Sequence, residues 1–328
     1  MTEASAVALT LIKSIVVATA LLLLPSARAD QTTIPRIGAL LSTGNSPLLA
    51  DGLRDGLHDL GYDEGKNILI EWRSAASDVE LRANAIDLAQ SKLDLIVVNT
   101  TAGARAALEA STTMPMVFVS GDPVATGLAA SLARPGGNAT GVSVVSTELF
   151  PKRLEYLHWI APRARRIAFL MNSSNPIAAT QLEATQKVAP LLGVQLVKLD
   201  ARDESELRKV LHALERGAAD GAIVSNDLLY RSTGSKVAQV LRKARLPAIF
   251  TYRQYLKEGG LMSYGPDLRE VGRKLAVYVD KILQGAKPAE LPIEQLSKYE
   301  LVIDLRVARE LKLNVPQDLL LRADEVIR

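Results

Sequence analysis

The stretch that decides the fold is Leu95-Ile96-Val97-Val98-Asn99-Thr100-Thr101, in which four apolar residues run directly into small polar ones. A helical pattern begins at about Ala102, so the polar residues stand where a buried strand gives way to a helix. A continuous apolar run without polar alternation is typical of a strand that is covered on both faces. The stretch therefore predicts parallel sheet with helices on both sides.

The same junction occurs at three further places in the chain. Residues 116–119 run into Ser120, residues 167–171 into Asn172, and residues 222–225 into Asn226 and Asp227. In doubly wound sheets, ligands bind beyond the carboxyl ends of the strands. Those ends carry hydroxyls, amides and two carboxylates here, without a thiol, a histidine pair or a glycine-rich phosphate loop. This set of groups predicts a binding site rather than a reaction centre.

Two series of alternating strands and helices follow one another. Strands are expected at 36–41, 67–72, 95–99, 116–120 and 140–145, and then at 166–171, 194–199, 221–225, 247–251, 260–264 and 299–305. Helices are expected to begin near Ser46, Asp78, Ala102, Asp122-Pro123, Pro176, Glu204, Ser232 and Leu268. The predicted fold class is α/β, with two doubly wound parallel-sheet lobes, a multi-segment hinge and a ligand cleft between the lobes.

The expected division follows from this count. Residues 34–145 plus 264–292 are assigned to lobe 1, and residues 146–263 plus 293–328 to lobe 2. Segments near 143–146, 251–264 and 292–299 are the candidates to cross between the lobes.

Composition narrows the class of protein. Apolar residues make up 48% of the 328 residues, and the net charge of +3 comes from interspersed acids and bases, so no nucleic-acid partner is expected. The chain has no Cys, which excludes disulfides, thiolate metal sites and a lipoprotein anchor. His58, His158 and His212 fall in separate predicted helices without metal-ligand spacing, so neither a metal nor a cofactor is expected.

Residues 1–29 have the features of a signal peptide. Lys13 precedes an apolar run at 15–24, and Ala27-Arg28-Ala29 forms a small-x-small cleavage site before Asp30. Cleavage after Ala29 would leave an exported mature chain of about 299 residues (328 minus 29), not embedded in a membrane. The alternative is an uncleaved anchor, although the run is short for a membrane helix.

Several ordered stretches match a known family and together cover essentially the whole mature chain. They are ADGLRDGL at 50–57, GDPVATGL at 121–128, RPGGNATGVS at 134–143, GGLMSYG at 259–265, YVDKILQG at 278–285, KYELVIDL at 298–305 and RADEVI at 322–327. On these residues the chain resembles the periplasmic ABC-transporter substrate-binding proteins of the tryptophan/tyrosine-binding type. The run from Asp-Pro to Gly-Gly-Asn-x-Thr-Gly is its most distinctive part.

The resemblance implies a monomeric periplasmic receptor that closes on a small-molecule solute and delivers it to an ABC permease of the inner membrane. Aromatic amino acids are the best-known cargo of the family, and other aromatic or small carboxylated molecules remain open. The loop at 42–47 lacks the His-Pro pair that many relatives carry there, which leaves the identity of the ligand open.

The candidate ligand-binding residues lie mostly at the predicted strand ends. Hydroxyls and free N–H groups at Ser42, Thr43, Thr100 and Thr101, and at Asn172 and Ser173 in the second series, are suited to a carboxylate. Plain helix capping is the alternative for each of these residues.

Two acids, Asp122 and Asp227, are the candidates to meet a ligand ammonium, with Asn226 beside the second. Asp122 before Pro123 has capping as its alternative role. Tyr230, Tyr252 and Tyr264 are the candidates to stack on a planar ligand, with ordinary packing as the alternative. Ser143 is expected to contact the ligand from the hinge side.

Two other functions remain open at this point. A glycosyltransferase-like enzyme with two α/β lobes would need a base and a phosphate site, and no phosphate loop is visible. A sensory receptor would bind the same solute but contact a signalling protein, and the sequence does not separate it from a transport receptor.

Overall fold

The structure is a computed structural model that describes residues 34–43, 46–175 and 177–328. The predicted signal peptide at 1–29 lies outside the described residues. Residues Pro35–Arg328 form one unit by their contacts. None of the described helices is both long enough and apolar enough to cross a membrane.

The first sheet has six strands in the order β11-β5-β4-β3-β1-β2. The strands are β1 (Arg36–Ser42), β2 (Leu69–Ala75), β3 (Leu95–Val98), β4 (Met116–Ser120), β5 (Ala139–Ser143) and β11 (Glu294–Gln295). All neighbouring pairs are parallel. Strand β3 is buried along its whole length, as its unbroken apolar run predicts.

The second sheet has seven strands in the order β13-β12-β10-β9-β8-β6-β7. The strands are β6 (Arg166–Met171), β7 (Gln195–Asp200), β8 (Gly221–Val224), β9 (Ala248–Phe250), β10 (Met262–Gly265), β12 (Glu300–Asp304) and β13 (Glu325–Ile327). The sheet is mixed, because β10 and β12 pair antiparallel while the other pairs are parallel. Strand β13 was not predicted.

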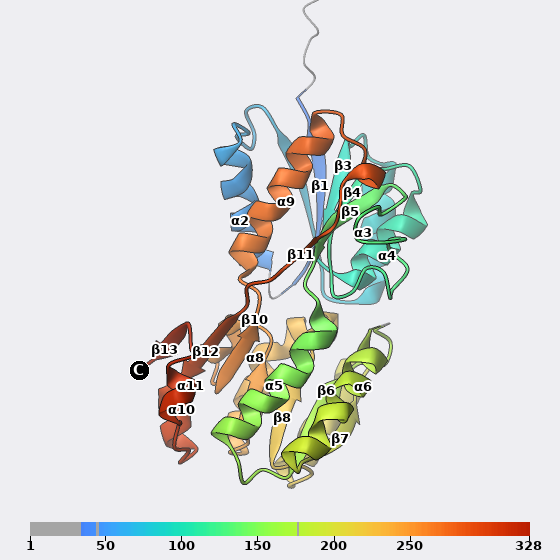
Figure 1. The fold of residues 1–328 in the computed structure, drawn as a ribbon. Coiled ribbons are helices and arrows are strands. Elements are labelled where there is room, and N and C mark those ends of the chain that lie inside the picture. The colour runs from blue at the N-terminus through green and yellow to red at the C-terminus, as the bar shows by residue number, and fades with distance from the viewer. Residues whose placement is uncertain (1–33, 44–45, 176) are drawn as a thin grey trace, which may run out of the picture. The chain divides into compact units, whose positions relative to one another are not determined.

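Helices cover both faces of both sheets (Figure 1). Around the first sheet they are α2 (Ser46–Asp59) and α9 (Leu268–Leu283) on one face and α3 (Asp78–Gln90) and α4 (Thr101–Ala110) on the other. Around the second sheet they are α7 (Glu204–Glu215) and α8 (Leu228–Lys243) on one face and α5 (Ser146–Ile160) and α6 (Ala178–Val188) on the other. Short helices complete the second lobe: α10 (Leu305–Glu310), α11 (Gln317–Leu320) and the 3-10 turns at Ala189–Leu192 and Arg253–Leu256. The predicted fold class, two doubly wound lobes, is confirmed.

The chain passes between the sheets three times. It crosses between β5 and α5 at 143–146, between β10 and α9 at 265–268, and between β11 and β12 at 295–300. The second crossing is displaced from the expected 251–264, because β10 pairs with β9 and β12 and so belongs to the second sheet. Residues 294–295, assigned to lobe 2 from the sequence, instead pair with β5 of the first sheet.

One local prediction is wrong for an identifiable reason. Asp122-Pro123 does not begin a helix: residues 123–127 form consecutive turns, and Gly127 takes a positive φ of 72° that ends them. Helix α3 begins at Asp78 as expected, and Ser77 caps it, because the Ser77 hydroxyl accepts the Glu80 N–H. In the same helix Leu81, Ala85 and Leu88 are buried, whereas Ile86 is exposed.

Candidate functional site

The strand orders place one crevice in each sheet. In the first sheet the strand order changes direction between β1 and β3. In the second sheet it changes direction between β6 and β8. At such switch points the connections leave the strands on opposite faces and open a crevice at the carboxyl ends. In the first sheet, Ser42 is the last residue of β1 and Asn99 follows β3. In the second sheet, Asn172 follows β6 and Ser225 follows β8.

One pocket takes its lining from both of these strand-end regions, and we call it the cleft pocket. It is lined from the first lobe by Asp78, Asn99, Thr100, Thr101, Ala102, Val119, Ser120, Gly121 and Val144, and from the second by Ser146, Asn172, Ser174, Asn175, Ile177, Gln181, Asn226, Asp227, Leu228 and Arg231. The lining combines hydroxyls, amides, two acids (Asp78 and Asp227) and one guanidinium with a short set of aliphatic side chains. Such a lining can hold a small molecule that carries both polar and apolar groups.

The first-lobe wall is built on the start of α4. The Thr100 hydroxyl caps the helix by accepting the Gly103 N–H at 2.9 Å. The Thr101 hydroxyl lies 3.0 Å from the Ser120 hydroxyl and accepts the Gly121 N–H at 3.3 Å. The capping alternative is therefore correct for Thr100, and both threonines also line the cleft pocket. A helix N-terminus beside hydroxyls favours a negatively charged group.

Three buried polar atoms of the lining have no hydrogen-bond partner among the described residues. They are Asn99 Nδ2, Gln181 Oε1 and Asp227 Oδ2, on side chains that are 2%, 1% and 8% exposed. A buried polar group without a partner costs about 1–3 kcal/mol. Asn99 Nδ2 is a donor, whereas Gln181 Oε1 and Asp227 Oδ2 are acceptors. A ligand with one acceptor and two donors would therefore remove the free-energy cost of all three unpaired atoms.

The two side chains on the second-lobe wall are held in place. Gln181 Nε2 donates to the Ser146 hydroxyl at 2.9 Å, which leaves its carbonyl oxygen as the free atom. Asp227 caps α8 through Oδ1, which accepts the Tyr230 N–H at 3.2 Å. Burial raises the pKa of Asp227 to about 7, although two backbone N–H groups and the Arg231 charge oppose the rise. Near neutral pH a ligand cation would stabilise the ionised acid.

Arg231, in the first turns of α8, connects the two lobes directly. Its Nη1 donates to the Ser42 hydroxyl at 3.1 Å and to the Asn99 carbonyl at 3.4 Å, both in the first lobe. Within its own lobe, Nε donates to the Asn226 carbonyl at 2.7 Å and Nη2 to the Tyr252 hydroxyl at 2.8 Å. The guanidinium therefore bridges the two lobes within the lining of the cleft pocket.

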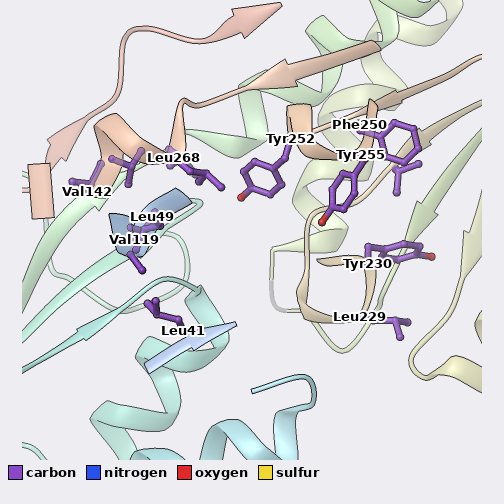
Figure 2. Packing of buried hydrophobic residues seen from close by; sticks show 14 of the residues in the cluster. Leu41, Leu49, Val119, Val142, Leu229, Tyr230, Phe250, Tyr252, Tyr255 and Leu268 are labelled. Carbon is purple, nitrogen blue, oxygen red and sulfur yellow. The ribbon is translucent and has the colours of Figure 1, made fainter. Parts of the chain in front are cut away.

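Apolar packing near Arg231 is continuous across the lobes. One buried cluster contains Leu41, Leu49 and Val119 from the first lobe together with Tyr252 and Phe250 from the second. Figure 2 shows the ring of Tyr252 on the side of Tyr255 and Phe250, with its hydroxyl directed toward the first-lobe side chains. The Tyr252 ring centroid lies 5.2 Å from the Arg231 guanidinium carbon, so the ring is an additional contact for the cation.

The thirteen predicted site residues fall into three groups. Five line the cleft pocket: Thr100, Thr101, Asn172, Asn226 and Asp227. Two do not line the pocket but accept hydrogen bonds from Arg231, which does: Ser42 and Tyr252. Six are outside the lining: Thr43, Asp122, Ser143, Ser173, Tyr230 and Tyr264.

The residues outside the lining have other contacts. Tyr230 is buried in the second lobe and donates to the Met171 carbonyl, so the structure gives it a core position rather than a cleft position. Tyr264 packs edge-on against Tyr156 near the hinge, with ring centroids 5.0 Å apart. Asp122 accepts the Ala125 N–H in its turn.

The remaining three are accounted for in the same way. The Ser143 hydroxyl accepts the Val145 N–H, and the Ser173 N–H is bound by Asp200. Thr43 has its N–H bonded to the Ala75 carbonyl, while its hydroxyl is buried without a hydrogen-bond partner among the described residues.

Sequence reasoning missed four important residues of the site: Asn99, Ser120, Gln181 and Arg231. The first two stand at strand ends, where the rule that found Thr100 could also have found them. Gln181 and Arg231 lie inside helices, where a polar residue ordinarily faces solvent, so helical periodicity carries no signal for them.

The fold and the cleft pocket define a class: two doubly wound lobes with a binding pocket between their strand ends, which is the arrangement of solute-binding receptors. A family model described as ABC transporter substrate binding protein matches residues 37–327, and the chain belongs to this family. The family resemblance predicted from the sequence is confirmed. The family is one of solute-binding proteins and not of enzymes.

Individual relatives agree with this assignment. A tyrosine-binding protein of Clostridioides difficile (strain R20291) is 28% identical over 255 residues, covering 77% of this chain and 73% of the relative. A Vibrio cholerae conserved domain protein is 26% identical, with a TM-score of 0.83 over 90% of this chain and 100% of the other. A Streptococcus pneumoniae ABC domain in complex with L-Trp has the same fold, with 24% identity, a TM-score of 0.83 and coverage of 90% and 100%.

Proposed function

We propose that this chain is the exported receptor of an ABC importer and that it captures an amino acid, with an aromatic side chain favoured. The observation that carries the proposal is the cleft pocket, whose lining leaves three buried polar atoms of complementary kind without partners. The L-Trp bound to the pneumococcal relative and the name of the Clostridioides difficile relative support the ligand class. The proposal assigns no catalytic step to the chain.

The polar head of such a ligand fits the two walls. Its carboxylate would lie at the start of α4, beside Thr100 and Thr101, and accept from Asn99 Nδ2. Its ammonium would donate to Asp227 Oδ2 and Gln181 Oε1 on the other lobe. Because the head would join atoms of both lobes, binding would favour the closed arrangement.

The side chain of the ligand would supply the rest of the affinity. A hydrogen bond to a charged group contributes about 1.5–3 kcal/mol, and micromolar binding needs about 8 kcal/mol. The aliphatic lining at Val119, Val144, Ile177 and Leu228 provides the apolar contact that would make up the difference.

The first prediction tests this assignment by isothermal calorimetry with the twenty amino acids and a set of aromatic acids. We expect micromolar or tighter binding of at least one aromatic amino acid. Asp227→Asn should weaken that binding at least tenfold, because a neutral amide replaces the acceptor for the ammonium. Native mass spectrometry of protein purified without refolding identifies any retained cargo.

Asp122→Asn is the matched control, because Asp122 caps a turn outside the pocket lining and should leave the affinity unchanged. Equal losses in both variants, or no solute bound by the unaltered protein, would refute the proposed ligand. The proposed location is tested by fractionation, with cleavage after Ala29 read from the N-terminal sequence of the mature chain.

A further inference from the structure

The hydrogen bonds of Arg231 separate it from the other polar residues of the cleft. It is only 8% exposed, and it makes four hydrogen bonds, to Ser42, Asn99, Asn226 and Tyr252. Each of its three guanidinium nitrogens donates to at least one of these acceptors. The acceptors are all neutral oxygens, so these bonds use four of its five N–H donors without cancelling its charge.

The distribution of the acceptors between the lobes is the important point. Nε and Nη2 bind oxygens of the second lobe, which fix the guanidinium relative to α8. Nη1 binds the Ser42 hydroxyl and the Asn99 carbonyl, which lie at the carboxyl ends of β1 and β3, the two strands that flank the switch point of the first sheet. These two bonds require the lobes to be close together, and they involve no ligand.

The contrast with the ligand-binding candidates is direct. Asn99 Nδ2, Gln181 Oε1 and Asp227 Oδ2 are buried in the same pocket and lack partners within the described chain, so they are available to a solute. The nitrogens of Arg231 are already occupied. A side chain whose donors are satisfied by both lobes acts on the arrangement of the lobes rather than on the ligand.

We infer that Arg231 is a positioning residue that fastens the two lobes in the closed arrangement before a solute binds. The inference rests on the proposed function only in taking solute binding as the event that closure serves. When the binding-competent arrangement is populated by a fraction f, the apparent dissociation constant is the intrinsic one divided by f. Arg231 raises f, and so it strengthens binding of every solute that the closed cleft accepts, whatever charge the solute carries.

The experiment compares Arg231→Gln with the unaltered protein by small-angle scattering, without ligand and with saturating ligand, and by calorimetry. In the ligand-free state we expect a larger radius of gyration for Arg231→Gln than for the unaltered protein, and with saturating ligand we expect equal radii. Affinity should fall about tenfold, by the same factor for an amino acid and for its amine analogue if both bind. Arg231→Lys should restore part of the compaction, since an ammonium can still bind one of the first-lobe oxygens.

Arg242→Gln is the matched control. Arg242 lies on the same helix and pairs with Glu310 on the surface of the second lobe, so its loss should change neither the radius nor the affinity. Ser42→Ala removes one of the two first-lobe acceptors and leaves the arginine in place, and it should give a smaller expansion of the same sign. This variant decides the question if Arg231→Gln does not fold.

Two results would overturn the inference. An unchanged ligand-free radius in Arg231→Gln and Ser42→Ala would show that the bridge does not hold the lobes together. A loss confined to solutes with a carboxylate would make Arg231 a ligand-contacting residue instead. The scattering comparison of ligand-free proteins needs no bound solute, so it remains decisive even if the proposed function fails.

Discussion

At the scale of single residues, the cleft pocket shows how burial gives ordinary side chains a specific chemistry. Asp227 caps α8 as an aspartate commonly does, yet its second oxygen is buried without a partner among the described residues. Gln181 is in the same position, with one amide atom satisfied by Ser146 and the other free. Such atoms destabilise the ligand-free protein and are therefore suited to binding a ligand.

The second prediction concerns the pH dependence of stability. Burial, the main cause, raises the pKa of Asp227 from 3.8 to about 7 in the folded protein. Because the folded state holds this proton more tightly than the unfolded state, the favourable contribution of Asp227 is complete below pH 4 and is lost as the pH rises to about 7. The loss is on the order of 4 kcal/mol.

Urea unfolding at pH 4, 5, 6 and 7 measures this effect. We expect Asp227→Asn, which keeps the cap, to gain stability relative to the unaltered protein across that range. A constant difference between the two proteins from pH 4 to pH 7 would show that Asp227 titrates normally.

The third prediction separates binding from stability at Gln181. Gln181→Met keeps the volume but removes both the free acceptor and the donor to Ser146. Affinity for an amino acid should fall about tenfold, whereas the two effects on stability oppose each other, so the free energy of unfolding should change by no more than about 1 kcal/mol. Calorimetry and thermal unfolding measure the two quantities. Gln195→Met, at the exposed start of β7, is the control for the substitution itself. A stable Gln181→Met variant with full affinity would remove Gln181 from the site.

At the scale of elements, α2 and α9 cross with almost no space between their backbones. A Cβ added at Gly272 would lie 2.3 Å from the Leu49 carbonyl oxygen, and one at Gly52 would lie 2.0 Å from the Arg269 carbonyl oxygen. The absence of side chains at these two positions therefore sets the distance between the helices. The crossing joins α9, which returns to the first lobe after the second crossing, to the first helix of that lobe.

The fourth prediction follows from that crossing. Gly272→Ala should destabilise the protein by about 1–3 kcal/mol or more, because the clash is with backbone and exceeds the gain in helix propensity. Gly137→Ala is the control, since nothing lies within 4 Å of its added Cβ, and its stability should change by less than about 0.5 kcal/mol. Denaturant unfolding measures both, and equal stability of the two variants would contradict the close packing.

Elements were predictable where one local signal dominates. The apolar runs of β1, β3 and β6 and the amphipathic pattern of α9 placed these elements to within a residue or so. The errors arose where tertiary contacts decide. Residues 325–327 form a strand because they pair with β12, and residues 294–295 join the first sheet because they pair with β5. Neither segment has a periodicity that identifies its partner.

At the scale of the whole molecule, two sheets with the same kind of switch point are the source of the site. Thr100, Asn172 and Asp227, which were predicted from the strand ends, line one pocket in the structure, and their role in binding stays a prediction. It could not bring in Arg231, because the role of that residue depends on how the lobes meet, which no local pattern of one helix encodes. Aromatic candidates were the least reliable, since Tyr230 and Tyr264 pack within the second lobe.

The central claim is that the cleft pocket binds both charged groups of an amino acid, the carboxylate and the ammonium. Calorimetric titration of the unaltered protein with L-tryptophan, tryptamine and indole-3-propionate tests it most directly, because the three share a ring and differ only in which charged group they keep. The account predicts the tightest binding for the amino acid and a loss of at least tenfold for each analogue. Equal binding of all three compounds would contradict it. So would a protein that binds none of the three compounds and no other amino acid.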